Sequence, residues 1–245
     1  MFGAYVIGDE LLVGKREDKH LPFLIGALAK RGLRLAWAHY VGDEPARLTA
    51  ALRRSFDSSD VVFSFGGIGA TPDDHTRQCA AAALGVALEL HAEAEKEIRG
   101  RFGSEVTPQR LQMGEFPAGS NIIPNPINRI PGFSLYEHHF VPGFPQMAWP
   151  MVEWVLDTRY RARFGTQGWK EASILVYEAG ESQLIPAMQA VEAAFKGIKV
   201  FSLPSMGHDG SRIHVELGVR GTPGEVEPAM ERLRALVGAA GFPYK

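Results

Sequence analysis

The sequence predicts an α/β protein of three layers, with a mostly parallel sheet between helices, followed by a second, smaller α+β domain. Strand-like and helix-like segments alternate through the first domain, which is typical of parallel strands joined by crossover helices. A buried apolar segment at 60–65 leads directly into a glycine-rich turn. The pattern changes after a polar, glycine-bearing stretch at 165–168. We therefore expect two domains, 1–166 and 167–245.

The elements of the first half follow from periodicity and from helix signals. A strand at 5–7 begins the chain, and apolar residues at helical spacing predict a helix after His20. An extended segment covers 34–41, and Pro45 opens a second amphipathic helix. Val61, Val62, Phe63 and Phe65 are apolar, as expected of a parallel strand that is buried on both faces.

The second half of this domain is less regular. We expect helices at about 74–84 and 92–102, and a closing helix at about 146–163. Between them, 117–145 is rich in proline, glycine and asparagine, which predicts turns with short strands. One such strand contains His138 and His139, whose side chains then point to opposite faces, so we interpret both as structural.

The second domain is expected to have the element order β-α-β-β-α. Apolar stripes at helical spacing run through 184–195 and 226–237. Between them, apolar residues at 213–219 alternate with polar ones, which is typical of a strand with one buried face. The pattern predicts a small sheet with helices on one face.

The composition excludes several classes of function. The formal charge of −2 leaves no excess of lysine and arginine for a nucleic-acid backbone or an anionic membrane, so we expect neither partner. The single cysteine, Cys79, excludes an intrachain disulfide. The N-terminus lacks a signal-peptide pattern, and no charge-free apolar run reaches the roughly 18 residues of a membrane span. We expect a cytoplasmic protein.

The glycine-rich turn Gly66-Gly67-Ile68-Gly69-Ala70-Thr71 is the first candidate site. Glycine tolerates positive φ and has no Cβ, so backbone N–H groups can approach an anion closely. The helix that follows adds its positive N-terminal end. The turn comes after a predicted parallel strand, at the edge of the sheet where open α/β folds bind ligands. The sequence therefore predicts a phosphate site at Gly66, Gly67, Gly69 and Thr71.

Asp73 and Asp74 follow this turn and have two interpretations. Thr71-Pro72-Asp73-Asp74 resembles a capping box, so the acids can be helix caps. A carboxylate that points into a phosphate site instead repels the ligand unless a divalent cation bridges the two. The second interpretation therefore implies Mg²⁺ or a similar metal, and the residues alone leave both open.

Further acids follow the first two extended segments. Asp9 comes after the strand at 5–7, and Asp43 comes after 34–41. Each taken alone is an ordinary loop or cap residue. Because parallel strands end at one edge of a sheet, both should lie near the glycine-rich turn. Their joint placement favours a metal-assisted phosphate site with Asp9, Asp43, Asp73 and Asp74 as candidate ligands.

These motifs together resemble a known family. They are Gly8-Asp9-Glu10-Leu11-Leu12-Val13-Gly14, Val41-Gly42-Asp43, Gly66 to Thr76, the Asn125-Pro126 to Pro131-Gly132 segment and Pro142-Gly143-Phe144-Pro145. In this order they resemble the molybdopterin-binding-like domain at the N-terminus of the competence- and damage-inducible CinA proteins. The resemblance implies the fold already predicted and a similar small domain after it. Since the chain ends at Lys245, we expect no amidase domain of the longer members.

The sequence departs from the family pattern at three places. Ala70 replaces a proline of the glycine-rich turn. Asp18-Lys19-His20 stands where an asparagine usually follows the first motif, and Asn128-Arg129-Ile130 precedes Pro131-Gly132 in place of the usual residues. The last of these departures concerns the details of ligand choice and not the fold.

The resemblance implies two functions of different classes. One is a pyrophosphatase that acts on ADP-ribose- or FAD-like substrates with Mg²⁺ or another divalent cation such as Co²⁺. The other is a protein that binds molybdopterin or a related pterin phosphate in molybdenum-cofactor metabolism, without hydrolysis. A domain that keeps the fold but has lost the chemistry is a third possibility.

The resemblance also implies which residues take part. Asp43 and Asp74 match the important acids of the molybdopterin adenylyltransferase relatives and are the first catalytic candidates, ahead of Asp9 and Asp73. Besides the glycine-rich turn, Asn125, Pro131 and Gly132 are implied to contact the ligand. Members of the family are commonly dimers, so we expect a homodimer.

Overall fold

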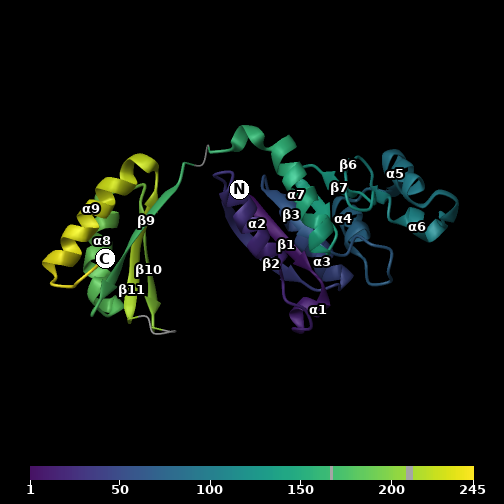
Figure 1. Ribbon diagram of the computed structural model, residues 1–245. Coiled ribbons are helices and arrows are strands. Elements are labelled where there is room, and N and C mark those ends of the chain that lie inside the picture. Colours follow the sequence, from purple (N-terminus) through teal and green to yellow (C-terminus); the bar gives the residue numbers. More distant parts are fainter. Residues whose placement is uncertain (166–167, 208–211) are drawn as a thin grey trace. The chain divides into compact units, whose positions relative to one another are not determined.

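The structure is a computed structural model that describes residues 1–165, 168–207 and 212–245. The chain forms two compact units, Met1–Gly165 and Thr166–Lys245. Each unit has its own hydrophobic core. Figure 1 labels the elements of both.

A six-stranded sheet in the order β2-β1-β3-β8-β7-β6 forms the centre of the first unit (Figure 1). Its strands are β1 (Phe2–Ile7), β2 (Leu35–Val41), β3 (Val61–Phe65), β6 (Asn121–Ile123), β7 (Gly132–Leu135) and β8 (His138–Val141). β1 pairs in parallel with β2 and β3, and β3 with β8, whereas β7 is antiparallel to β8 and to β6. The mostly parallel α/β fold is thus confirmed. The antiparallel edge arises because only Tyr136 and Glu137 join β7 to β8, too few residues for a parallel crossover.

Helices cover both faces of this sheet. They are α1 (Asp9–Leu12), α2 (His20–Ala29), α3 (Pro45–Phe56), α4 (Thr76–Leu84), α5 (Ala92–Phe102), α6 (Pro108–Gln112) and α7 (Pro145–Arg159), with 3-10 turns at Gly103–Glu105 and Arg161–Arg163 and a two-stranded sheet of β4 (Leu88–Leu90) and β5 (Glu115–Pro117). α2 and α7 pack on one face, and α3 and α4 on the other. α3 begins where its signals predict, since Pro45 is its first residue and the Glu44 carboxylate accepts the N–H groups of Ala46 and Arg47.

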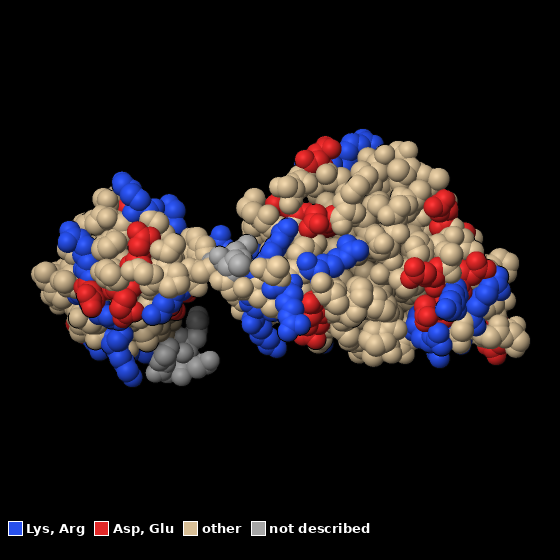
Figure 2. All heavy atoms as spheres, turned by 90° about the horizontal axis from the view of Figure 1, so that it is seen from above, with Lys and Arg blue, Asp and Glu red and all other residues tan. Residues whose placement is uncertain are grey.

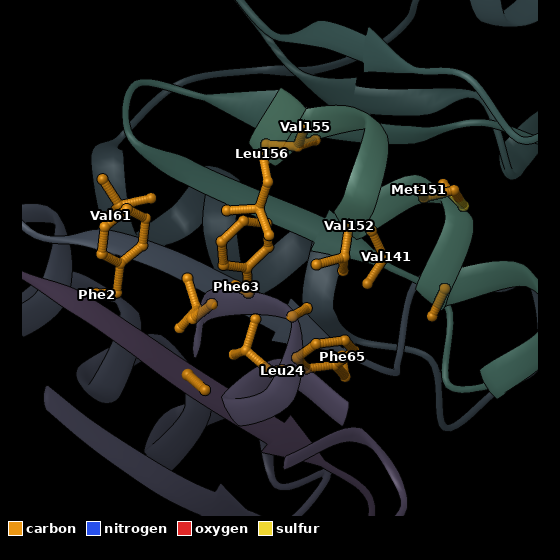
Figure 3. Packing of buried hydrophobic residues seen from close by; sticks show 14 of the residues in the cluster. Phe2, Leu24, Val61, Phe63, Phe65, Val141, Met151, Val152, Val155 and Leu156 are labelled. Carbon is orange, nitrogen blue, oxygen red and sulfur yellow. The ribbon is translucent and has the colours of Figure 1, made fainter. Parts of the chain in front are cut away.

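Large apolar side chains of β1 and β3 fill the space under α7. Phe2, Phe63 and Phe65 are at most 1% exposed, as are Val152 and Leu156 of α7. Figure 3 shows these aromatic rings of the sheet facing the apolar side of the helix. Alternate residues of β1 enter the core on the opposite face, so this strand is buried on both sides, as the apolar run predicts.

The two adjacent histidines of β8 are buried on opposite faces of the sheet. The His138 Nε2 atom lies 2.8 Å from the Ser55 hydroxyl. The His139 ring lies between the Ser134 hydroxyl, 2.8 Å from Nδ1, and the Tyr160 hydroxyl, 2.6 Å from Nε2. Burial lowers the pKa of His138 to about 4 and the pKa of His139 well below its usual range. Both rings are neutral parts of the core, far from metal-ligand geometry.

The second unit has the element order expected from its periodicity. Its elements are β9 (Lys170–Tyr177), α8 (Glu181–Ala194), β10 (Lys199–Ser205), β11 (His214–Gly221) and α9 (Pro223–Ala239). The three strands form an antiparallel sheet in the order β10-β11-β9. Both helices lie on one face of that sheet (Figure 1), where Val215, Leu217 and Val219 of β11 meet Leu184 and Leu233.

Two surface properties bear on possible partners. No helix within 1–165, 168–207 or 212–245 has the length and apolar character needed to cross a bilayer. On the face seen in Figure 2, acidic and basic side chains lie interspersed over the described residues. That a nucleic acid is not a partner stays a prediction.

Truncation of the central strand tests the core. Phe63→Ala should lower the free energy of unfolding of the first unit by about 3–5 kcal/mol, since a fully buried aromatic ring is lost and a cavity is left. Urea denaturation measures this change. The control is Val13→Ala, at a side chain that is 65% exposed, where about 0.5 kcal/mol or less is expected. Equal losses in the two variants would contradict the packing described.

The buried His138 ring predicts a loss of stability in acid. Its pKa is about 4 in the folded chain and near 6.5 when exposed, so the unfolded chain takes up the proton first as the pH falls. The contribution is therefore complete above pH 6.5 and is lost as the pH falls through 4. Relative to His138→Asn, wild type should lose about 3 kcal/mol more between about pH 7 and 4, because a tenfold change in proton affinity corresponds to about 1.4 kcal/mol. The free energy of unfolding of each protein is measured in urea at both pH values. Equal losses in wild type and His138→Asn would refute this prediction.

Candidate functional site

The glycine-rich turn, defined as the glycine loop Gly66–Thr71, connects the carboxyl end of β3 to the region before α4. Gly66 and Gly67 have φ angles of 101° and 68°. A Cβ on Gly66 would lie 2.5 Å from the Ile7 carbonyl oxygen, and one on Gly67 would overlap the Thr76 hydroxyl. Both positions therefore need glycine for their conformation and for the closeness of their neighbours.

Residues at the start of α4 donate hydrogen bonds to carbonyl groups of the glycine loop. The Thr76 hydroxyl donates to the Gly66 carbonyl at 3.0 Å, and the Thr76 N–H donates to the Gly67 carbonyl at 3.0 Å. The Arg77 guanidinium donates to the Gly69 carbonyl at 2.6 Å. By contrast, the N–H groups of residues 67–70 meet no acceptor within the part of the chain that the structure describes. These free donors are what an anion site requires.

Arg77 places a buried cation directly beneath the glycine loop. The residue is only 3% exposed, and its guanidinium also donates to the main-chain carbonyls of Gln112 and Glu115. Burial lowers its pKa, and the charges of Glu115 and Asp74 act in the opposite direction. The sequence analysis missed this residue, because an arginine early in a helix is usually solvated.

The acids after the loop form a turn instead of opening the helix. The Asp74 carboxylate accepts hydrogen bonds from the Thr71 N–H, at 2.9 Å, and from the Thr71 hydroxyl. The Asp74 N–H donates back to the Thr71 carbonyl at 3.0 Å. α4 begins only at Thr76, and the capping-box interpretation is therefore wrong. Asp74 lies against Gly69, where a Cβ would overlap its carboxylate, while Asp73 is exposed.

Asp9 and Asp43 hold each other's loops at the same edge of the sheet. The Asp9 N–H donates to the Asp43 carboxylate at 2.9 Å, and the Asp43 N–H donates to the Asp9 carboxylate at 3.2 Å. Gly42 allows this approach, since a Cβ there would overlap the Asp9 carboxylate. The structure thus brings the two predicted acids together. One carboxylate oxygen of each residue accepts the backbone N–H of the other.

The charge around Asp43 is strongly negative. Burial raises its pKa, as do the nearby charges of Asp9, Glu10 and Asp73, against one backbone hydrogen bond that lowers it. Among the residues that the structure describes, no three histidine, cysteine or acidic side chains are arranged to bind a metal ion. A cation at this edge would therefore have at most two of these side chains as ligands.

A pocket of about 580 Å³, the loop pocket, lies above the glycine loop. Most predicted site residues line it, namely Asp43, Gly66, Gly67, Gly69, Thr71, Asp73, Asp74, Asn125 and Pro131. Asp9 does not line the pocket and is connected to it only through its hydrogen bonds with Asp43. Gly132 does not line it and belongs to β7, where a Cβ would overlap the Phe140 carbonyl oxygen. The closeness of strands β7 and β8, not a ligand, requires that glycine.

The far wall of the loop pocket comes from the turn-rich region. Asn125 shapes this wall, because its amide donates to the Ile130 carbonyl at 3.0 Å and accepts the Ile127 N–H at 3.1 Å. Met113 and Met147 supply apolar surface. Arg16 is the one lysine or arginine among the described residues that line the pocket. The sequence analysis did not single out these last three residues.

Comparison with known proteins agrees with this architecture. Residues 3–162 match the family model described as "Probable molybdopterin binding domain". A CinA-like protein of an Anaeromyxobacter species is 33% identical and is aligned over 94% of this chain. A Pyrobaculum aerophilum protein is 30% identical, with 81% of this chain and 77% of that protein covered.

A crystal structure of the protein CinA "with unknown function" from Thermoplasma acidophilum has 27% identity and a TM-score of 0.59. It matches 64% of this chain and 95% of its own. The present chain spans 62% of the length of its Anaeromyxobacter relative. The matched family model, these relatives and the shared fold together place the chain in the molybdopterin-binding domain family, as a CinA-like member.

Proposed function

We propose that the first unit binds the phosphate groups of a nucleotide or pterin ligand on the glycine loop. The observation that carries this proposal is the set of free N–H groups at 67–70, next to carbonyls that are already bonded to Thr76 and Arg77. Such a loop attracts an anion through several backbone dipoles at once. The buried Arg77 guanidinium adds positive charge beneath it.

We further propose that the bound ligand is hydrolysed at a pyrophosphate bond, as in ADP-ribose or FAD. Glu10, Asp43, Asp73 and Asp74 line the pocket that receives the phosphates, and their charges oppose binding unless a cation is present. Mg²⁺ commonly uses one or two carboxylates together with substrate phosphates, and Asp43 and Asp73 fit that donor set. When bound, Mg²⁺ or Co²⁺ would neutralise the pyrophosphate and polarise phosphorus.

The acids then have distinct roles in this proposal. Asp43 faces the ligand, and Asp9 fixes its loop through the exchanged hydrogen bonds. Asp74 orders the glycine loop through Thr71 and adds charge next to Gly69. The N–H groups of the loop stabilise negative charge that develops on the transferred phosphate.

A second function, binding of molybdopterin or a related pterin phosphate without hydrolysis, is favoured by a different observation. Asp9 and Asp43 use their carboxylates on each other's backbone, and the described residues contain no preassembled metal site. Binding through the glycine loop does not require one. We propose a homodimer acting in the cytoplasm for either function.

The free N–H groups of the glycine loop predict a selective effect of Gly67→Ala. The new methyl group overlaps the Thr76 hydroxyl and moves the loop, so the Kd for Mg²⁺-pyrophosphate should rise at least about tenfold, or about 1.4 kcal/mol. Titration calorimetry measures it. Gly85→Ala is the matched control, since Gly85 has nearly the same φ, 67° against 68°, with no atom near its Cβ position. Equal binding by both variants would remove the loop as the anion site.

The charge of Asp74 can be separated from its structural role. Asp74→Asn keeps an oxygen for the Thr71 N–H but removes the negative charge. We expect loss of Mg²⁺-dependent ADP-ribose hydrolysis with pyrophosphate binding retained, measured by mononucleotide release with and without EDTA. Asp57→Asn, at an exposed site after α3, is the control. Undiminished turnover would exclude Asp74 from the reaction, and no product from wild type would favour the pterin-binding function.

A further inference from the structure

A second pocket lies beside the loop pocket and has no role in the proposal above. Its volume is about 680 Å³, within the usual range for sites that bind small molecules. Ile7, Glu10, Arg16, Gly143 and Phe144 line both pockets, so the two adjoin. We call the second one the His20 pocket.

We propose that the His20 pocket binds the planar, uncharged nitrogen heterocycle of the ligand whose phosphates lie on the glycine loop. This inference rests on the proposed phosphate binding and adds the part of the ligand that the loop does not recognise. It assigns selectivity to the start of α2, the start of α7 and the end of the turn-rich region that leads into α7.

The walls of the His20 pocket suit a flat ring. Phe65, Trp149 and the His20 ring line it, together with the aliphatic side chain of Leu11. At the junction of the two pockets stands Phe144, which is 55% exposed although it is a large apolar residue. The exposed Phe144 ring can stack on a heterocycle, whereas Phe65 and His20 are at most 6% exposed and form the floor beneath it.

Two buried nitrogen atoms of the wall lack partners. The His20 ring is stacked on Phe65 at 4.6 Å, and its Nε2 lies 3.1 Å from the Gly143 carbonyl oxygen. Because a carbonyl only accepts, Nε2 carries the hydrogen and Nδ1 of the neutral ring is an acceptor. Neither this Nδ1 nor the Trp149 Nε1–H has a partner among the described residues. A nitrogen heterocycle carries both donor and acceptor groups, so it can pair with either atom once the side chains that cover that atom move.

The charges of the pocket do not favour a second phosphate. Glu10, Glu17 and Asp18 outnumber the two cations of the wall, Arg16 and Lys19. The Asp18 carboxylate is already occupied by the first N–H groups of α2 and by the Tyr40 hydroxyl. An anionic group would therefore be repelled, whereas an uncharged ring would not.

Filling the pocket tests the inference. Gln146 is an exposed residue near the start of α7 and lines only the His20 pocket, so Gln146→Trp should occupy it without disturbing the core. Calorimetry compares ADP with pyrophosphate, and neopterin phosphate with inorganic phosphate, all with Mg²⁺. In wild type at least one heterocyclic ligand should bind about tenfold more tightly than its plain counterpart. In Gln146→Trp that advantage should disappear, with pyrophosphate binding unchanged.

A control variant and a second pocket-filling variant complete the test. Gln189→Trp makes the same change at an exposed position of α8 and should behave as wild type. Lys19→Trp fills the pocket from the N-terminal end of α2 instead of α7. It should reproduce the effect expected of Gln146→Trp and serves as the test if Gln146→Trp misfolds. If heterocycles bind no better than plain phosphates, or if the advantage survives both fillings, this inference is overturned while the proposed phosphate binding stands. If wild type binds no pyrophosphate, both fall.

Discussion

The hydrogen bonds that hold the carbonyl groups of the glycine loop are the constraint on which the site depends. Thr76 and Arg77 donate to the carbonyls of residues 66, 67 and 69, and the N–H groups of residues 67–70 have no acceptor among the residues that the structure describes. The cost is a buried guanidinium, and its bonds to main-chain carbonyls offset part of the lost hydration. Because the loop is fixed before any ligand arrives, binding requires little further ordering.

Positive and negative side chains with opposite effects on an anion lie at the same edge of the sheet. Arg77 lies under the loop, whereas Asp43 and Asp73 line the pocket above it, where we propose that phosphates bind. Burial raises the pKa of Asp43, and the neighbouring carboxylates raise it further. Attraction by backbone dipoles and repulsion by side chains therefore act on one ligand. A cation removes only the repulsion, so binding and hydrolysis can differ in their dependence on metal.

Much of the fold could be predicted from local patterns, but the details of the site could not. Periodicity and helix signals identify β3 and α3, because burial and capping act over a few neighbouring residues. The start of α4 was misplaced at Asp74, because a capping box and an isolated turn share one sequence pattern. The role of Arg77 depends on carbonyls as distant as Glu115. Gly132 serves strand packing, which no local motif distinguishes from ligand contact.

The two adjoining pockets imply a division of recognition within one unit. The glycine loop presents backbone groups, which cannot distinguish one phosphate ester from another. Selectivity must therefore come from side chains that reach the rest of the ligand. The stretch at Asp18, Lys19 and His20, where the sequence departs from the family pattern, lines the His20 pocket and not the loop pocket. Under the two proposals made above, a change in this wall would alter the heterocycle that is bound and leave the glycine loop unchanged.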